Sequence, residues 1–396
     1  MLSPKFANIL MLRGLEPLKW NVKTKTNVLQ FWVKKKSHSE VCPKCATLCK
    51  TVYDRRTVKV KDEPIRGQAV LLYIQKRRFF CKTCQKPFTE PINDVKKGSR
   101  VSDRYRRYVF WACENFGDLS SVRQEARCSA SFLYKTYYGQ LEQQARCNRR
   151  AQWPTTVGID EHSFKRNKVY GHTEFVTVFV NYNKRRLIDV VEGKQSGLLQ
   201  EGLSGIPNPE NVKHVILDLA DSYKSFAKGY FPNAQLIADK FHVLRLLNPA
   251  INKYRKLSLG ESRTLPVRKL LLANSERLDY LTRRVLWKGL SDHPALRDVY
   301  MFKEGLHRLY RCKGIVNAGI CLTRLTDEMA KSTVPEVHSL RKTLMKWRNE
   351  ILAYFETRLT NARTEGFNNK AKVIKRRAYG YRSFKNYRLR LLAACR

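Results

Sequence analysis

Residues 212–242 read VKHVILDLADSYKSFAKGYFPNAQLIADKFH, and this stretch decides the fold class. An apolar run ends at Asp218, a helix-like segment follows from Ser222 to Gly229, and a second short apolar run covers Ala234 to Ala238. Apolar runs of this length are typical of buried strands. The strand–helix–strand order therefore predicts an α/β core.

The same kind of pattern continues on both sides of this stretch. Towards the N-terminus, three further segments have the composition of strands: Val157 to Asp160, Glu174 to Asn181 and Arg186 to Glu192. Towards the C-terminus, the periodicity is helical from about 240 to 360, as Leu244, Leu247 and Ile251 illustrate. The last segment, Gly366 to Arg396, is basic and is predicted to be partly helical.

Two smaller regions precede this core. Residues 1–95 hold two close cysteine pairs, and β-rich stretches such as Ala69 to Ile74 lie between the pairs. Residues 96–150 have a helical pattern. We therefore predict three domains, at 1–95, 96–150 and 151–396.

The composition indicates a polyanionic partner. The chain has 396 residues and is 43% hydrophobic and 11% aromatic, which excludes wholesale disorder and a collagen-like fibre. Its 77 Lys plus Arg against 34 Asp plus Glu give a formal net charge of +43, which favours nucleic acid or an anionic membrane as partner. Because no run of about 18 apolar residues occurs, we expect no membrane-spanning helix and favour nucleic acid.

The N-terminus and the cysteine count bear on the compartment. The apolar segment Phe6 to Leu12 is short, is followed at once by Arg13 and lacks a small-residue cleavage site, so we expect a packed segment rather than a signal peptide. The 11 cysteines are an odd number in a long chain without a secretory signal. These features predict a reducing cytosol and a metal-binding role for the paired cysteines.

The two cysteine pairs have the spacing of a metal site. Cys42 and Cys45 form one C-x-x-C knuckle, Cys81 and Cys84 form the other, and 35 residues separate the knuckles. Four thiolates suit tetrahedral Zn²⁺, and strands between the knuckles would make a zinc ribbon. Buried or redox-active thiols are the alternative, and Cys49 could compete as a ligand. The isolated cysteines are predicted to be small core residues: Cys113, Cys128, Cys147, Cys312, Cys321 and Cys395.

Residues 118–135 have the form of a helix-turn-helix. Val122 and Ala126 give the first helix an apolar face, the turn falls near Cys128, and Ser129 or Ser131 can cap a second helix. The candidate DNA contacts of that second helix are Ser131, Tyr134, Lys135 and Tyr138. A plain helical hairpin is the alternative.

Three carboxylates stand out in this basic chain. Asp160 and Asp218 each close an apolar strand, and Glu365 lies in a segment whose other charges, from Arg363 onward, are all basic. Carboxylates of this kind bind Mg²⁺, and two such ions can clamp the attacking and leaving oxygens in phosphodiester displacement. The alternative for each is a helix cap or a surface acid. Alternation along the strand favours Asp160 over Glu161 as the ligand.

A D-x-x-H motif, Asp239 to His242, follows the predicted strand that ends at Ala238. The spacing suits a helix start, where Asp239 caps the helix and His242 faces the site to position the scissile phosphate or a hydroxide. A buried histidine hydrogen-bonded to its own cap is the alternative.

Taken together, these motifs resemble the DDE transposases of bacterial insertion sequences, specifically the ISL-three family, over nearly the whole chain. The matching segments are Cys42 to Cys84, residues 118–140, Gly158 to Phe164, Val215 to Asp218 with Tyr223, Phe231 to Ala234, Asp239 to Val243, and Glu365 to Arg382. The last two are the most specific.

The resemblance implies an α/β ribonuclease-H-like catalytic core with a mostly helical insertion at about 245–355, preceded by a small zinc-ribbon-like domain and a helix-turn-helix domain. In such a core Asp160, Asp218 and Glu365 would form the triad that binds two Mg²⁺ or Mn²⁺ ions, while zinc is structural. It also implies a bacterial, cytoplasmic, nucleoid-associated protein that acts as a homo-oligomer on double-stranded DNA. The expected phosphate contacts near the triad are Lys370, Lys375, Arg376, Arg377 and Arg382.

The implied activity is binding of the terminal inverted repeats, cleavage there, and joining of the 3′ ends to target DNA. Two rival hypotheses remain at this stage. One is a DNA-binding regulator whose acids are structural or whose catalysis is lost, and the other is a metal-dependent nuclease without strand transfer.

Overall fold

The computed structural model describes residues 14–116, 118–148, 152–166, 171, 173–260 and 266–395. The chain forms two compact units, one up to Leu141 and the other from Glu142 onward. The predicted packed segment from Phe6 to Leu12 lies outside the described residues. Among the described residues, no helix is both long and apolar enough to cross a membrane.

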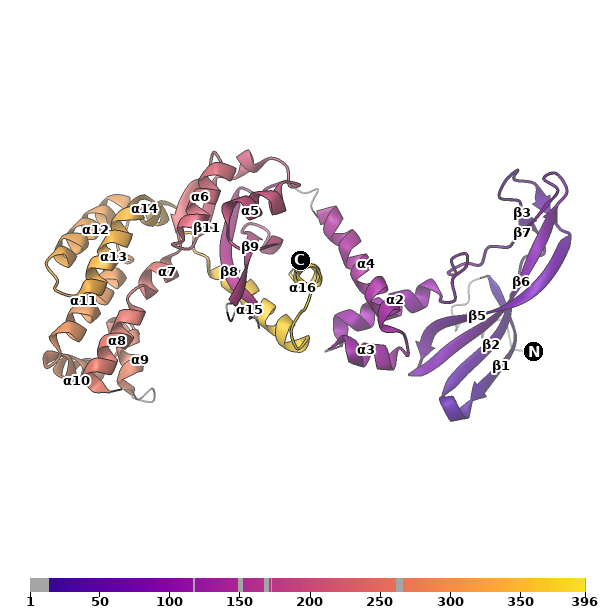
Figure 1. Ribbon diagram of the computed structural model, residues 1–396, viewed down its shortest axis with the longest axis horizontal. Helices are drawn as coiled ribbons and strands as arrows, with labels where there is room; N and C mark the ends of the chain where they lie inside the picture. Colours follow the sequence, from indigo (N-terminus) through magenta and orange to yellow (C-terminus); the bar gives the residue numbers. More distant parts are fainter. Residues whose placement is uncertain are drawn as a thin grey trace. The chain divides into compact units, whose positions relative to one another are not determined.

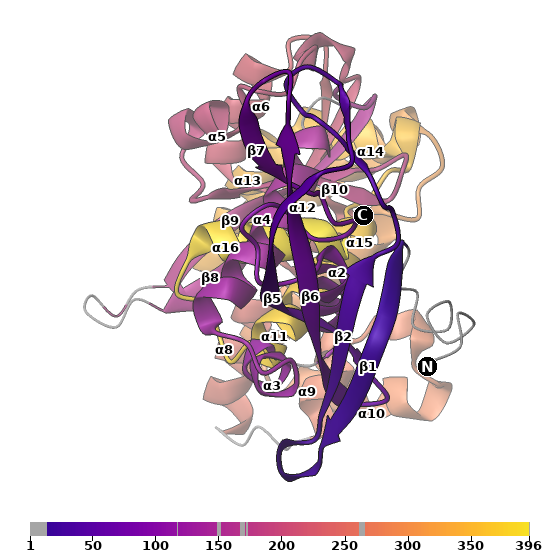
Figure 2. The same cartoon turned by 90° about the vertical axis from the view of Figure 1, so that its right-hand side faces the viewer.

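The first unit is built on a five-stranded sheet. Its strands are β1 (Leu15–Lys23), β2 (Val28–Lys35), β5 (Val52–Ile65), β6 (Gln68–Cys81) and β7 (Lys86–Thr89). Figure 2 shows β5, β6, β2 and β1 side by side in this order, and β7 pairs with the end of β6. The predicted strand Ala69 to Ile74 lies inside β6, where Val70, Leu72 and Ile74 alternate into the core.

Three helices follow this sheet: α2 (Asp103–Asn115), α3 (Leu119–Glu125) and α4 (Ala130–Asn148). Lys61 on β5 donates to the backbone oxygen of Ala126 at 2.8 Å, and Arg104 on α2 pairs with Asp62 at 2.7 Å. The helices are thus tied to the sheet within one compact unit, although the sequence pattern predicts a domain boundary at residue 95. A division into separate domains at residues 95 and 150 stays a prediction.

The second unit contains the predicted α/β core, a mixed five-stranded sheet. Its strands are β8 (Thr156–Arg166), β9 (Thr173–Asn181), β10 (Arg186–Glu192), β11 (His214–Leu217) and β12 (Gln235–Ala238). The order is β10-β9-β8-β11-β12, in which β10, β9 and β8 are antiparallel neighbours while β8, β11 and β12 are parallel. Figure 1 labels β9, β8 and β11 of this sheet. Each strand predicted from an apolar run is confirmed, and β8 extends well beyond the predicted Asp160.

The links between these strands are helical. They are α5 (Ser196–Leu203), the short 3-10 helix η2 (Pro209–Asn211) and α6 (Asp221–Tyr230). Phe226 and Ala227 of α6 are fully buried against strand residues such as Val215 and Ile237. The amphipathic pattern between Ser222 and Gly229 is therefore the buried face of α6.

The predicted helical insertion is confirmed between β12 and the C-terminal helices. It comprises α7 (Lys240–Arg245), α8 (Asn248–Leu259), α9 (Pro266–Leu272), η3 (Ser275–Arg277), α10 (Tyr280–Ser291), α11 (Pro294–Leu309), α12 (Ile315–Ala330), α13 (Pro335–Lys346) and α14 (Arg348–Thr357). Leu247 and Ile251 are buried as expected, but the helix is not continuous from Leu244, because α7 ends at Arg245. The break precedes Pro249, which sits in the first turn of α8.

Two C-terminal helices, α15 (Ala362–Arg377) and α16 (Phe384–Ala394), return to the sheet. The guanidinium of Arg388 on α16 donates to both carboxylate oxygens of the buried Asp189 on β10, at 2.6 and 2.7 Å. The amide of Leu187 donates to the carbonyl of Cys395 at 3.0 Å. These contacts hold the C-terminal segment against β10, the edge strand of the sheet.

Candidate active site

Asp160 and Asp218 meet at one edge of the second sheet. Gly158 on β8 pairs with Ile216 on β11 in parallel register, so the residues two positions further on, Asp160 and Asp218, reach the same level and the same face. Carboxylate oxygens of both lie within 4.8 Å of each other and of a ring nitrogen of His242. All three residues were predicted from the sequence as members of one site.

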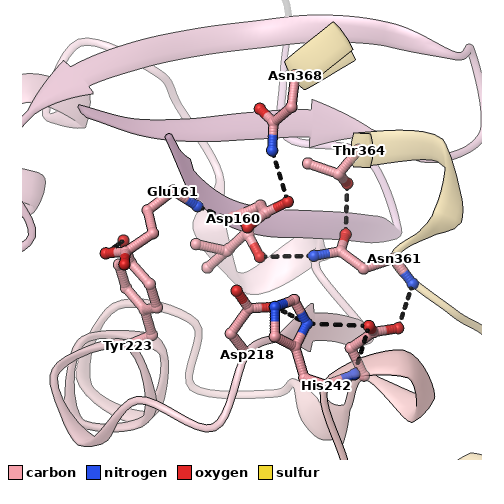
Figure 3. Close-up of polar contacts among 10 residues, drawn as sticks. Asp160, Glu161, Asp218, Tyr223, His242, Asn361, Thr364 and Asn368 are labelled. Atoms are coloured by element: carbon pink, nitrogen blue, oxygen red, sulfur yellow. Dashed lines mark hydrogen bonds and ion pairs between the residues drawn. The ribbon is translucent and has the colours of Figure 1, made fainter. Parts of the chain in front are cut away.

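His242 is presented by the start of α7. Asp239 caps this helix by accepting the backbone amide of His242 at 3.3 Å, as the D-x-x-H spacing predicts. The ring nitrogen Nδ1 of His242 lies 3.1 Å from Oδ2 of Asp239 and 2.8 Å from Oδ1 of Asp218 (Figure 3). His242 is thus bonded to its own cap and also faces Asp218, but it is half-buried rather than buried as the alternative required.

Helix α15 begins directly against β8. The side chain of Asn361 donates to the carbonyl of Ile159 at 2.9 Å, and its backbone amide donates to Oδ1 of Asp239 at 2.8 Å. Gly158 makes this approach possible, because a Cβ there would lie 2.7 Å from Oγ1 of Thr364 and 2.9 Å from Oδ1 of Asn361. A glycine at this strand position therefore allows the helix to dock on the site.

Asn368 of α15 is the residue that touches Asp160. Its amide nitrogen donates to Oδ2 of Asp160 at 2.7 Å, so its oxygen is left to accept from Nδ1 of His162 at 3.1 Å (Figure 3). The other ring nitrogen of His162 then accepts the hydroxyl of Tyr387 on α16. A buried hydrogen-bonded chain of four side chains therefore fixes the orientation of the Asp160 carboxylate.

The electrostatics of this site favour a cation. Burial, together with the adjacent charge of Asp218, raises the pKa of Asp160 to about 8. Burial opposes the charge on His242, but its contacts with Asp218 and Asp239 outweigh that effect and raise the pKa of the imidazole to about 10. Burial and nearby Lys375 lower the pKa of His162 to about 4, so His162 is neutral at physiological pH.

The donor set fits a divalent metal ion. Oδ1 of Asp218 is buried, and it lies 2.8 Å from Nδ1 of His242 as an ion pair without a well-aligned hydrogen bond. A buried carboxylate oxygen that accepts no aligned hydrogen bond can still take a cation as its partner. Two adjacent carboxylates, one of them with a pKa raised by burial and by the charge of the other, supply the oxygen ligands that Mg²⁺ prefers.

Glu365, the third predicted ligand, does not join this group. Its side chain is exposed on the first turn of α15, while Asn368, one turn later on the same side of the helix, contacts Asp160. Glu161 points elsewhere, since its carboxylate accepts the hydroxyl of Tyr223 at 3.3 Å and lies 3.9 Å from Lys194. The structure thus brings together two acids of the predicted triad and leaves the third outside this cluster.

Three site residues were missed by the sequence analysis: Asn368, His162 and Tyr387. Asn368 lies one helical turn from Glu365, a spacing that could have suggested a shared face. His162 is two positions from Asp160 on a strand, so both face the same side of the sheet. Nothing in the sequence could have indicated the link of His162 to Tyr387, which is 225 residues away.

The predicted phosphate contacts differ in what they touch. Lys375 is turned inward, because its ammonium donates to the carbonyl oxygens of Ser163 and Phe164. Lys370 reaches the carbonyl of Ala394 at 3.4 Å. The remaining three side chains are exposed: Arg376, Arg377 and Arg382. An exposed guanidinium can meet a phosphate, whereas Lys375 as placed here cannot.

In the first unit, the segment predicted as a helix-turn-helix forms two helices. Ser129 caps α4 by accepting the amide of Phe132 at 3.2 Å, and Val122 and Ala126 are buried as predicted. Ser131, Tyr134 and Lys135 are exposed on α4. Tyr138 is buried and packs against Tyr134 and Tyr137, so it does not face solvent as the prediction requires of a DNA contact.

The four paired cysteines converge. The sulfurs of Cys42 and Cys84 lie 3.9 Å apart, those of Cys45 and Cys81 lie 3.5 Å apart, and all four fall within 4.8 Å of one another. A tetrahedron with Zn–S bonds of about 2.3 Å has edges of about 3.8 Å, so the set fits Zn²⁺. Cys49 lies outside this group, since its thiol is directed at the carbonyl of Thr47 at 3.5 Å.

The isolated cysteines only partly follow the prediction of core residues. Cys113 and Cys395 are buried, while Cys128, Cys312 and Cys321 are half-buried. Cys147 is exposed, so the prediction is wrong for it. It lies near the end of α4, where the helix presents little apolar surface.

Comparison with known proteins identifies the family of the chain. Residues 157–391 match the ISL3 family of DDE enzymes, which is described as "Transposase", and residues 38–84 match the "zinc-finger of transposase IS204/IS1001/IS1096/IS1165". The transposase for insertion sequence element IS1001 of Bordetella parapertussis is 24% identical over 392 residues, covering 96% of this chain and 95% of that protein.

A second relative, the transposase for insertion sequence element IS1557 in two strains of Mycobacterium tuberculosis, is 25% identical over 260 residues, 57% of each chain. The family match covers more than half of the chain and includes both strand-end acids, the helical insertion and α15. The chain therefore belongs to the ISL3 family of DDE transposases and carries that family's zinc ribbon.

Proposed function

We propose that this transposase binds the terminal inverted repeats of an insertion sequence, cleaves the DNA there with Mg²⁺, and joins the 3′ ends to target DNA. The observation that carries the proposal is the buried pair Asp160 and Asp218, which meet at the ends of neighbouring parallel strands with their carboxylate oxygens within 4.8 Å of each other. The sheet order, with three antiparallel strands continued by two parallel ones, supports a ribonuclease-H-like core.

Asp160, Asp218 and Glu365 would hold the ions in this proposal. When bound, a pair of Mg²⁺ or Mn²⁺ ions would lower the pKa of the attacking water or 3′ hydroxyl and stabilise the leaving oxygen. Asn368 would keep the Asp160 carboxylate aimed at the ion, since it donates to the oxygen Oδ2. Glu365, exposed on the first turn of α15, would turn towards the two aspartates when DNA and metal are bound.

His242 would act on the DNA rather than on the metal. Its Nδ1 is held by Asp239 and Asp218, which leaves Nε2 free to donate to an oxygen of the scissile phosphate. Asp239 is therefore a positioning residue, because it also holds the first amide of α15 through Asn361. One carboxylate thus couples the histidine to the helix that carries Glu365.

DNA binding would be shared by both units. In the first unit, the zinc ribbon and the helices α3 and α4 would position the element end, with Ser131, Tyr134 and Lys135 exposed towards it. In the second, Arg376, Arg377 and Arg382 would hold phosphates near the cut. Cleavage of two ends would require a homo-oligomer on the DNA, in the cytoplasm of a bacterium and on its nucleoid.

The test is incubation of the purified protein with its own flanking DNA ends and Mg²⁺, with cleavage and joining measured separately. Asp160→Asn, Asp218→Asn and Glu365→Gln should each abolish both products. Two neighbouring acids provide matched controls: Glu161→Gln and Asp221→Asn should keep both, because Glu161 faces Tyr223 and Asp221 pairs with Lys346 on the surface.

The rival hypotheses predict other outcomes of the same assay. Cleavage by Asp160→Asn or Asp218→Asn at the wild-type rate would overturn the metal site. End binding without cleavage in any protein, the wild type included, would indicate a regulator. Cut ends without joined products would indicate a nuclease that lacks strand transfer.

A further inference from the structure

The turn between α15 and α16 presents one aromatic ring to solvent. Tyr379 is 93% exposed, more than any other large hydrophobic side chain among the described residues. Its backbone has a φ of +50°, in the left-handed region that residues other than glycine rarely adopt. A left-handed residue is common at the end of a helix, but it is usually glycine or asparagine, so a tyrosine at this position is unusual.

Backbone hydrogen bonds hold this turn in place. The amide of Tyr379 donates to the carbonyl of Arg376 at 3.1 Å, and the amide of Gly380 donates to the carbonyl of Lys375 at 3.0 Å. These bonds close the C-terminal end of α15, and Gly380 follows with a φ of +97°. The ring of Tyr379 therefore projects from a fixed turn rather than from a loose chain.

The ring is surrounded by cations along the chain. Arg376 and Arg377 precede it in the last turn of α15, and Arg382 follows it. All three are exposed, and none forms an ion pair with an acid in the part of the chain that the structure describes. A protruding aromatic ring among unpaired guanidinium groups is the combination that binds a nucleobase and its flanking phosphates.

We propose that Tyr379 stacks on an unstacked base of the element-end DNA while Arg376, Arg377 and Arg382 hold the adjacent phosphates. This inference rests on the proposed function and adds a DNA-distorting contact that the catalytic residues do not provide. Stacking tolerates any base, because every base offers a π-face. It would unstack the duplex near the cut, as inserted side chains do in other DNA complexes.

The helix fixes where the stacked base must lie. Glu365 and Tyr379 belong to the same helix and its closing turn, 14 residues apart. With a rise of about 1.5 Å per residue the two are about 20 Å apart. With Glu365 at the cut, as the proposed function requires, and with base pairs of B-DNA spaced at about 3.4 Å, we expect the stacked base within about six base pairs of the cut.

The test uses Tyr379→Ala and Tyr379→Phe, with Tyr280→Ala as a control because Tyr280 is also exposed, at 74%, but lies on α10. The probe is the element-end duplex with 2-aminopurine placed at each of the ten positions nearest the cut, in EDTA so that no cleavage occurs. Wild type, Tyr379→Phe and Tyr280→Ala should show a fluorescence change at a position within about six base pairs of the cut.

Tyr379→Ala should lose that change and bind the duplex about 5- to 150-fold more weakly, the range seen when stacked aromatic residues are truncated. The salt dependence of binding distinguishes stacking by the ring from phosphate contacts by the guanidinium groups. Tyr379→Ala should keep the wild-type slope of log affinity against log salt concentration, while Arg376→Ala should reduce the magnitude of that slope by about 1. Equal melting temperatures would show that Tyr379→Ala leaves the fold unchanged.

Two results would overturn the inference. One is wild-type affinity and fluorescence in Tyr379→Ala, and the other is a loss of self-association without DNA in Tyr379→Ala, which would assign the ring to a protein contact. The assay is independent of catalysis. If Asp218→Asn still cleaved DNA while Tyr379→Ala lost the fluorescence change, the proposed metal site would fail and the stacking contact would stand.

Discussion

Asn368→Ala tests whether the orientation of Asp160 matters to the site. The substitution removes the donor to Oδ2 of Asp160, at 2.7 Å, and the acceptor for Nδ1 of His162, at 3.1 Å. Both partners are buried, at 8% and 7% exposure, so water cannot replace the lost side chain without opening the site.

The magnitude follows from the two orphaned partners. Each buried group left without a hydrogen bond costs about 1–3 kcal/mol, so Asn368→Ala should reduce the free energy of unfolding by about 2–6 kcal/mol. At about 2–4 °C per kcal/mol for a unit of this size, the melting temperature should fall by about 4–24 °C. Because the carboxylate also loses its orientation, end cleavage should slow by about 10- to 100-fold at a temperature where the variant is fully folded.

The matched control is Asn369→Ala, because Asn369 has the same side chain, is the next residue on α15 and is exposed. Thermal unfolding and single-turnover cleavage of the element end, both in Mg²⁺, measure the two effects. If Asn368→Ala matched Asn369→Ala in melting temperature and came within threefold of it in cleavage rate, the hydrogen-bonded side chains that link Asp160 to Tyr387 would have no positioning role.

Three further predictions follow from the structure. Because the pKa of Asp160 is near 8, the folded protein holds a proton there that the unfolded chain, with its ordinary carboxyl pKa, has released above about pH 4, so without metal the stability falls as pH rises towards 8. Mg²⁺ should therefore raise the melting temperature more at pH 8.5 than at pH 6.5, and equal shifts at the two pH values would argue against metal at Asp160. Gly158→Ala should cost about 1–3 kcal/mol of stability because its Cβ would meet Thr364 and Asn361, whereas Gly366→Ala on α15, with open space around it, should be neutral or stabilising; a neutral Gly158→Ala would disprove the close docking of α15. Purified protein should hold about one Zn²⁺ per chain, and Cys42→Ser should lose the metal and lower the stability of the first unit, whereas a zinc content near zero in unchelated wild type would refute the ribbon.

The sequence predicted the sheet of the second unit well because its strands are short apolar runs between turns. The second half of β8 was missed, since residues 161–166 read EHSFKR, in which Phe164 is the single apolar side chain, and they pair only with β9. Similarly, local spacing identified the caps at Asp239 and Ser129, because a cap depends on neighbours three residues away.

The site itself could be predicted only in part. Asp160 and Asp218 were found because strand ends of a parallel pair meet at one edge. The link through Asn368 joins residues more than 200 positions apart, which no local pattern reveals. The count of basic residues near Glu365 could not show which of them are free to contact phosphate. Arg376 is exposed, whereas the ammonium of Lys375 donates to the carbonyl oxygens of Ser163 and Phe164.

The most direct test of the account is a change of metal preference at Asp218. Mg²⁺ takes oxygen ligands and accepts thiolate poorly, whereas transition metals such as Mn²⁺ tolerate sulfur. Asp218→Cys should therefore fail to cleave the element end in Mg²⁺ and regain cleavage in Mn²⁺, while Asp221→Cys, three residues further on and exposed, should cleave in both. Cleavage by Asp218→Cys in Mg²⁺ at the wild-type rate would show that this carboxylate holds no catalytic metal ion.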